Sequence, residues 1–332
     1  MLITANQDLT TPDYPHWLGA DWALPERARR IEQLLAEQPR HTPESLAALQ
    51  MDERSATAQA LIAELLPAPK PLSERSTLVE RALSRLQRWD AVLRSGAPEP
   101  LIYANWLRVL TARVYQDELG ELWGEVVNEA GERLTEGLLD PRSHWCDIVS
   151  TPEVESCPAL AERSLREAVD ELARQYGGDL DAWRWGEAHP AHFHATPLGE
   201  LPLVGRLFDA FVPSGGGNDT VNLGEYLIDD PVEPFASRCG PSYRAVYDLG
   251  APESSRFLVG IGQSGNPLSP YYRHWAQRWQ RGEGVPMLTQ RARIEAEGAQ
   301  RLQLLPCAAG SACAQAEPIA LNPSSSRGGY AK

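Results

Sequence analysis

MLITANQ at residues 1–7 and PERARRIEQLL at residues 25–35 are the two stretches from which we predict the fold of this chain. The first is typical of a short strand that runs directly into a turn at Ala5-Asn6. The second is typical of a helix start, because a proline in the first helical turn loses no hydrogen bond. We therefore expect a strand, a turn and a helix in that order. Asn6 should lie in the turn, and Arg27 in the first turn of the helix.

Further helices are predicted in the first half of the chain. Apolar residues recur there at spacings of three and four, the pattern of an amphipathic helix. Thr42 before Pro43 is a typical N-cap, and Gly177 is a typical C-cap. The predicted helices after the first cover residues 43–66, as one helix or two, and residues 78–89, 101–119 and 161–176.

The character of the sequence changes in the second half. Residues 181–262 hold 11 of the 26 glycines, and a helical pattern returns at 271–280. Because helices precede strands instead of alternating with them, the pattern favours an α+β fold. Beyond residue 305 the composition is typical of a poorly ordered tail, so we expect one body over residues 1–305 and a low-complexity tail over residues 306–332. The expected strands lie at residues 221–223, 243–249 and 257–259.

Composition excludes several classes of function. The 332 residues include 31 Lys and Arg and 45 Asp and Glu, which gives a net charge of −14. Such a chain repels phosphate backbones, which argues against a nucleic-acid partner. No apolar run reaches the roughly 18 residues of a membrane helix. The N-terminus has no basic region followed by an apolar stretch, so no signal peptide is visible.

The five cysteines form no CxxC metal motif. Cys146 and Cys157 lie close together in the sequence. They form either a disulfide that closes a small loop or two ordinary thiols. A disulfide would fit an oxidising compartment such as a periplasm.

Three histidines, His189, His192 and His194, follow one another closely. Such a group suggests a metal site. The surrounding pattern has no obvious carboxylate or thiolate set, and Pro190 constrains the loop. We therefore interpret these histidines as hydrogen-bonded side chains of a folded connection.

Two glycine-rich segments resemble nucleotide-binding loops. Gly260 to Gly265 matches GxGxxG, but a dinucleotide site needs a helix to open there. Asn266-Pro267 blocks such a helix. Gly215-Gly216-Gly217 is followed by neither a lysine nor a predicted helix, so a flexible or tightly turned entry to a strand is the better interpretation.

Asn6 and Arg27 could each have an ordinary structural role instead of a functional one. Asparagine is common in turns, and an arginine at a helix start is usually a solvated or salt-bridged charge. Amide hydrolysis, however, passes through a tetrahedral oxyanion. A neutral N–H donor directed at that oxyanion is worth about 3 kcal/mol.

The Asn6 turn followed by the Arg27 helix resembles the middle of the large subunit in the penicillin acylase family of N-terminal-nucleophile hydrolases. The order and spacing of several other segments strengthen the resemblance. These segments are residues 49–55, 89–90, 145–147, 183–189, 216–221, 262–267 and 279–282.

This resemblance implies a four-layer αββα sandwich, of which the chain would form part. It implies hydrolysis of the amide bond of an N-acyl substrate such as a β-lactam antibiotic or an acyl-homoserine lactone. Asn6 would donate to the oxyanion, and Arg27 would support Asn6. No cofactor is needed for the chemistry, but a calcium ion often lies between the family's subunits. Asp21 is the nearest candidate ligand, and its alternative role is to interact with the helix dipole.

The family's enzymes are periplasmic or secreted heterodimers cut from one precursor, with a serine nucleophile at the start of the large subunit. This sequence has no such serine: Leu2 follows Met1, and Ser311 lies in the tail. It also departs from the family at residues 271–274. We expect a C-terminal portion of the large subunit, inactive alone, whose partners are the small subunit and the upstream part of the large subunit. The alternative is a non-catalytic relative that binds an acyl ligand or a partner.

Overall fold

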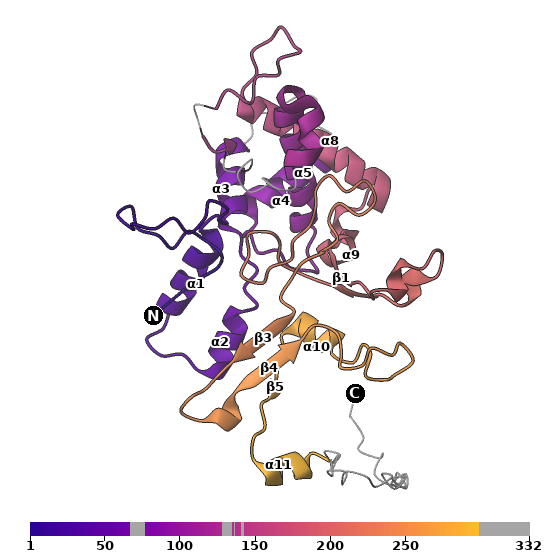
Figure 1. The fold of residues 1–332 in the computed structure, drawn as a ribbon. Coiled ribbons are helices and arrows are strands. Elements are labelled where there is room, and N and C mark those ends of the chain that lie inside the picture. Colours follow the sequence, from indigo (N-terminus) through magenta and orange to yellow (C-terminus); the bar gives the residue numbers. More distant parts are fainter. Residues whose placement is uncertain (67–76, 128–134, 136, 141–142, 299–332) are drawn as a thin grey trace, which may run out of the picture. The chain divides into compact units, whose positions relative to one another are not determined.

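The computed structural model describes residues 1–66, 77–127, 135, 137–140 and 143–298 (Figure 1). The chain divides into two compact units, Met1–Met287 and Leu288–Lys332. The helices of the first unit are α1 (Glu26–Ala36), α2 (Pro43–Leu49), α3 (Ala56–Leu65), α4 (Thr77–Arg88), α5 (Glu99–Leu119), α6 (Trp123–Val126), α8 (Cys157–Tyr176), α9 (Trp185–Ala188) and α10 (Ala276–Arg281). In the second unit, the described residues contain α11 (Arg291–Ala296).

The strands are short and all lie in the second half of the first unit. They are β1 (Pro190–Phe193), β2 (Ala210–Pro213), β3 (Tyr243–Val246), β4 (Arg256–Val259) and β5 (Val285–Pro286). β1 and β2 form one antiparallel pair, and β3, β4 and β5 form an antiparallel sheet in that order. Turns of 3-10 helix lie at Gly120–Leu122, Leu180–Ala182, Leu198–Glu200, Gly205–Leu207 and Pro252–Ser254.

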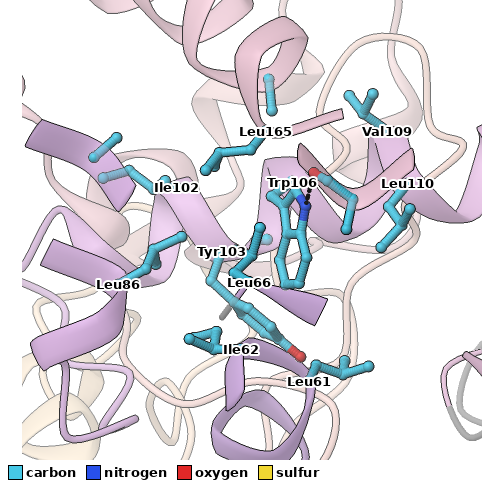
Figure 2. Packing of buried hydrophobic residues seen from close by; sticks show 14 of the residues in the cluster. Leu61, Ile62, Leu66, Leu86, Ile102, Tyr103, Trp106, Val109, Leu110 and Leu165 are labelled. Atoms are coloured by element: carbon cyan, nitrogen blue, oxygen red, sulfur yellow. Dashed lines mark hydrogen bonds between the residues drawn. The ribbon is translucent and has the colours of Figure 1, made fainter. Parts of the chain in front are cut away.

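The main core forms around α5, which packs along α8 and also contacts α4 and α9. α5 is apolar on nearly every side, as expected for a helix buried on all faces. Trp106 lies at its centre, fully buried, and its indole N–H donates to the carbonyl oxygen of Ala161 at 2.9 Å (Figure 2). This core joins α3, α4, α5, α8 and α9 as one packed body.

A second, smaller core lies beneath the strands. Ala191 of β1 and Val212 of β2 pack there with Leu258 of β4 and Trp279 of α10. Trp279 also donates from its indole N–H to the carbonyl oxygen of Pro241 at 2.7 Å. The short strands are therefore held by side-chain packing from both sheets and from α10.

Most of the predicted helices are confirmed. The helix predicted from residue 25 is α1, and the apolar pattern over residues 43–66 forms two helices, α2 and α3. Thr42 caps α2 as predicted and forms a reciprocal capping box with Ser45. The helical first half followed by a second half with strands confirms the α+β class.

Three predicted elements differ from the structure. The expected strands at the N-terminus and at residues 221–223 are isolated bridges, Gln7 with Ala23 and Gly217 with Leu223, because neither segment has a neighbouring strand to pair with. The helix predicted from residue 271 begins only at Ala276. The carbonyl of Tyr271 accepts hydrogen bonds from the backbone of residues 263 and 264, so it is not part of a helical ladder. The tail predicted from residue 306 lies outside the described residues.

Cys146 and Cys157 form a disulfide, with their Cα atoms 5.0 Å apart. Cys157 is the first residue of α8, so the bond ties the preceding loop to the start of that helix. Cys239 is a free, exposed thiol. None of the helices in the described part of the chain is both long and apolar enough to cross a membrane.

Candidate functional site

The turn predicted at Asn6 is present, and its backbone is unusual. Asn6 has a φ of 67°, in the left-handed region that asparagine tolerates better than most residues. Its carbonyl oxygen accepts a hydrogen bond from the backbone of Ala23 at 3.0 Å. The side chain of Gln7 accepts from the backbone N–H of the buried Ala5 at 2.7 Å. These contacts hold the turn in place while the side chain of Asn6 stays exposed.

Arg27 connects the start of α1 to this turn. Its Nη2 atom donates to the side-chain oxygen of Asn6 and to the carbonyl oxygen of Ala5, each at 2.9 Å. Because a guanidinium only donates, the amide atom of Asn6 that faces it is the oxygen. The Nδ2 group, with two N–H donors, is therefore the other end of the amide and is directed away from Arg27. The result is a neutral donor whose orientation is fixed by a cation.

The helix that carries Arg27 is itself anchored. Arg30, one turn later, forms a bidentate ion pair with Asp52 at 2.9 and 2.7 Å. Ala28 is buried on the same helix. Arg29 has a 68% exposed side chain and contacts only Glu26 of the same helix at 3.5 Å. Of the three neighbouring arginines, Arg27 and Arg30 thus have fixed long-range partners, and Arg29 is a surface charge.

Behind this ion pair lies a buried polar cluster of Glu53, Asn222 and Arg244. The side-chain amide of Asn222 donates to Glu53 at 3.2 Å, and Arg244 donates to the side-chain oxygen of Asn222 at 2.6 Å. The guanidinium of Arg244 also lies over the ring of Trp279, 4.7 Å from its centroid. Sequence reasoning did not single out these residues, because each is remote in sequence from the others.

Burial changes the titration of this cluster. Desolvation raises the pKa of Glu53 to about 7, against the effect of its hydrogen bond from Asn222. Desolvation also lowers the pKa of Arg244 to about 10. The backbone of Gly215 lies so close to the Glu53 carboxyl that a side chain at 215 would overlap it. The triple glycine is therefore a tight turn packed on Glu53, but it leads into an isolated bridge at Leu223 and not into the expected strand.

The GxGxxG segment does not lead into a helix, as predicted from its sequence. No helix begins between Gly260 and Gly265, and the next helix in this fully described stretch starts at Ala276. The geometry of a dinucleotide site is therefore missing here.

The three histidines fall into two groups. His189 is fully buried, its ring stacks on Trp185 at 4.3 Å, and its Nδ1 donates to the carbonyl oxygen of Phe235 at 2.6 Å. Burial lowers the pKa of His189 to about 4, so this ring is neutral and structural. His192 and His194 instead face a carboxylate, Asp209, which the sequence pattern did not reveal.

Asp21 is exposed, in the loop before α1. Within the described ranges, the only group of three potential metal-ligand side chains is His192, His194 and Asp209. Among the described residues, Asp21 is therefore not grouped with two further His, Cys, Asp or Glu side chains.

Comparison with known proteins places this chain in a family. Residues 1–296 match the family model described as penicillin amidase. The chain belongs to the penicillin amidase family. The sequence is 30% identical over 327 residues to acyl-homoserine lactone acylase QuiP of Pseudomonas syringae, and 27% identical over 308 residues to the penicillin acylase 2 proenzyme of a Pseudomonas species.

A solved penicillin amidase relative confirms the fold. The structure of a thermostable penicillin G acylase from Alcaligenes faecalis superposes with a TM-score of 0.57 at 15% identity, over 92% of this chain and 56% of that chain. This likeness confirms the expected fold of the N-terminal-nucleophile hydrolase type. Against the two acylases named above, the match covers 92% of this chain but only 39% and 38% of theirs. The chain thus spans about two-fifths of the length of these relatives.

Proposed function

We propose that this chain supplies the oxyanion-stabilising side of an enzyme that hydrolyses the amide bond of an N-acyl substrate. The observation that carries the proposal is the contact between Arg27 and Asn6, in which the guanidinium holds the amide oxygen at 2.9 Å. Membership of an amide-hydrolase family supports the reaction class.

The proposed role of Asn6 follows from the charge that develops during hydrolysis. Attack on an amide carbonyl turns its oxygen into an oxyanion, and a fixed N–H donor stabilises that charge more than it stabilises the substrate. Asn6 offers its Nδ2 group without adding a charge. Arg27 acts through Asn6, because it fixes the amide plane and withdraws electron density from the amide oxygen.

We propose that the nucleophile and the rest of the substrate pocket come from protein outside these 332 residues. The match to only 39% of a curated relative supports this division. Large apolar side chains are also exposed just after the Asn6 turn, among them Trp17, which is 83% exposed. Exposed apolar groups of this kind mark interaction surfaces. The small subunit and the upstream part of the large subunit would cover them.

The proposed substrates are N-acyl small molecules of the acyl-homoserine lactone or β-lactam type. This proposal is supported by the names of the relatives, an acyl-homoserine lactone acylase and a penicillin acylase. A second candidate function is a non-catalytic relative that binds an acyl ligand or a partner. The pairing of Asn6 with Arg27 favours the enzyme, because binding alone does not need an oriented donor.

We also propose that the protein works in the periplasm or outside the cell. The disulfide between Cys146 and Cys157 supports this, because such bonds persist in oxidising compartments. No cofactor is proposed for the chemistry. A structural calcium ion at Asp21 stays a prediction that needs ligands from beyond the described residues, and equilibrium dialysis of the assembled protein against Ca²⁺ tests it.

The proposal is tested with chromogenic phenylacetyl and long-chain acyl amides. One sample is this chain, and the other is this chain preceded by the coding sequence that lies upstream in the same reading frame. We expect hydrolysis only by the longer protein. Hydrolysis by the chain alone would contradict the proposed division of labour. A longer protein that binds acyl amides in a thermal-shift assay but hydrolyses none would favour the non-catalytic alternative.

A further inference from the structure

The register of β1 and β2 gathers three potential metal ligands. The pairing of the two strands ends with Phe193 opposite Ala210, and one more step of the same register sets His194 opposite Asp209. Side chains on a strand alternate between its two faces, so His192 shares the face of His194. A diagonal neighbour across an antiparallel pair is still within reach of a long side chain. All three side chains therefore converge at one end of the strand pair.

The two faces of this strand pair have different surroundings. Ala191 and Val212 point into the second core. On the opposite face, the ring of Phe211 stacks on His192 with centroids 4.4 Å apart. This stacking limits the rotation of the His192 ring. The strand pair that carries the ligands therefore rests on the second core through its other face, and the ring of Phe211 packs beside His192 on the ligand face.

The distances suit a tetrahedral ion. With bonds of roughly 2.0–2.2 Å, neighbouring ligand atoms around tetrahedral zinc lie roughly 3.3 Å apart. Asp209 Oδ2 lies 2.7 Å from His192 Nε2 and 3.4 Å from His194 Nδ1. The ligand atoms all lie within 4.8 Å of one another. His192 Nε2 has to move back from Asp209 by roughly 0.6 Å when an ion replaces the hydrogen shared between them.

The carboxylate of Asp209 is held from outside the ligand set. Its side chain is only 4% exposed, and its Oδ1 accepts from the backbone N–H of Ala195 at 2.8 Å. A hydrogen bond of this kind orients a metal ligand. The backbone of Gly199 packs so closely that a side chain there would overlap both Asp209 and His194. His194, with a 42% exposed side chain, leaves an approach from solvent.

We propose that His192, His194 and Asp209 bind one divalent transition-metal ion, with Zn²⁺ as the best match. Two imidazoles and one carboxylate are ligands that suit zinc, and three protein ligands leave a fourth position for water. The ligands bracket residues 195–208. A bound ion would therefore fix both ends of this loop and hold the end of the strand pair together. The site uses none of the residues around Asn6.

The experiment begins with the 332-residue chain freed of metal by a chelator. Zn²⁺ is titrated in by isothermal calorimetry, and Co²⁺ is followed by its visible absorption, which reports the ligand geometry. We expect one saturable site per chain. His194→Ala should weaken Zn²⁺ binding at least tenfold, and so should His192→Ala and Asp209→Asn.

His194→Ala is the key variant, because an exposed side chain is replaced and folding should not change. His274→Ala is the matched control, since His274 is also exposed and its ring contacts neighbours in its own turn, the carbonyl oxygen and ring of Tyr271 and the ring of Trp275. It should bind Zn²⁺ like the parent chain. Zn²⁺ should also raise the melting temperature of the parent chain and of the control, but not that of His194→Ala.

Two results would overturn the proposal. One is an absence of saturable Zn²⁺ and Co²⁺ binding by the parent chain. The other is binding that His194→Ala and His192→Ala both leave unchanged, which would place the ion elsewhere. In either case, the contact between His192 and Asp209 would be a structural hydrogen bond only.

Discussion

Arg27 Nη2 lies 2.9 Å from the side-chain oxygen of Asn6, across 21 positions of sequence. The same nitrogen also holds the carbonyl oxygen of Ala5. One donor group thus fixes both the backbone and the side chain of the turn, so the orientation of the Asn6 amide depends on where α1 begins. Any change at Arg27 should therefore act on Asn6 first.

The first prediction concerns Arg27 in the assembled enzyme. Arg27→Leu removes the donor that orients Asn6, and Arg27→Lys replaces a planar fork with a shorter point charge. We expect kcat to fall at least roughly tenfold in both, which corresponds to about 1.4 kcal/mol, with a smaller change in KM. Steady-state kinetics on one acyl amide measure this.

Arg29→Leu is the control for that series. Arg29 lies on the same helix, is 68% exposed and pairs only with Glu26. Its replacement should leave kcat and KM unchanged. If Arg29→Leu reduced kcat as much as Arg27→Leu, helix stability rather than the orientation of Asn6 would explain both effects.

A second prediction concerns Glu53 and pH. Its pKa is raised to about 7 in the folded chain, from 4.5 as a free side chain, chiefly by burial. Between these values the folded state binds more protons than the unfolded state, so the free energy of unfolding falls as pH rises. The loss from this group alone is up to about 3 kcal/mol, and it is complete above about pH 7.

Glu53→Gln should remove this dependence. A glutamine keeps an oxygen that accepts from Asn222 and carries no charge to desolvate. Urea unfolding from pH 5 to pH 8 should show that the unfolding free energy of the variant increases relative to that of the parent chain as pH rises. A difference in stability that stays constant over this range would mean that Glu53 does not titrate there.

The disulfide gives a third prediction. Cys146 and Cys157 are 11 positions apart, and closing a loop of this size stabilises a protein by roughly 2–3 kcal/mol. Replacing both cysteines with alanine should lower the unfolding free energy by about that amount. Cys239→Ala instead removes an exposed thiol that forms no disulfide and should have little effect. If the double variant and Cys239→Ala lost the same unfolding free energy, the closure of the loop would contribute nothing to stability.

A fourth prediction tests the main core. Trp106 is fully buried and donates to Ala161, so Trp106→Ala should cost about 3–5 kcal/mol through the cavity and the unpaired carbonyl. Trp17 is 83% exposed, and Trp17→Ala should change stability by less than about 0.5 kcal/mol. Chemical denaturation of both variants provides the comparison.

The sequence predicted local structure better than long-range contacts. The helices follow from a spacing that lies within one segment, and the Thr42 cap depends on three consecutive neighbours. The strand predicted at the N-terminus was wrong, because alternation alone does not supply a partner strand. Gln7 makes only a single bridge to Ala23.

The residues of the candidate sites that sequence reasoning missed contact partners that are far from them in the sequence. Glu53 meets Asn222 across 169 positions, and no local pattern links them. Asp209 joins His194 across 15 positions, and only the register of two strands brings them together. Asn6 and Arg27 were proposed through a family resemblance, and their direct contact is what the structure adds.

The most direct test of the account is the kinetics of Asn6→Ala in the assembled enzyme. The account predicts that kcat for an N-acyl amide falls by roughly 10²–10³, with KM changed little, because a donor to the transition state is lost. A variant that folds like the parent enzyme and keeps its full kcat would contradict the oxyanion role of Asn6.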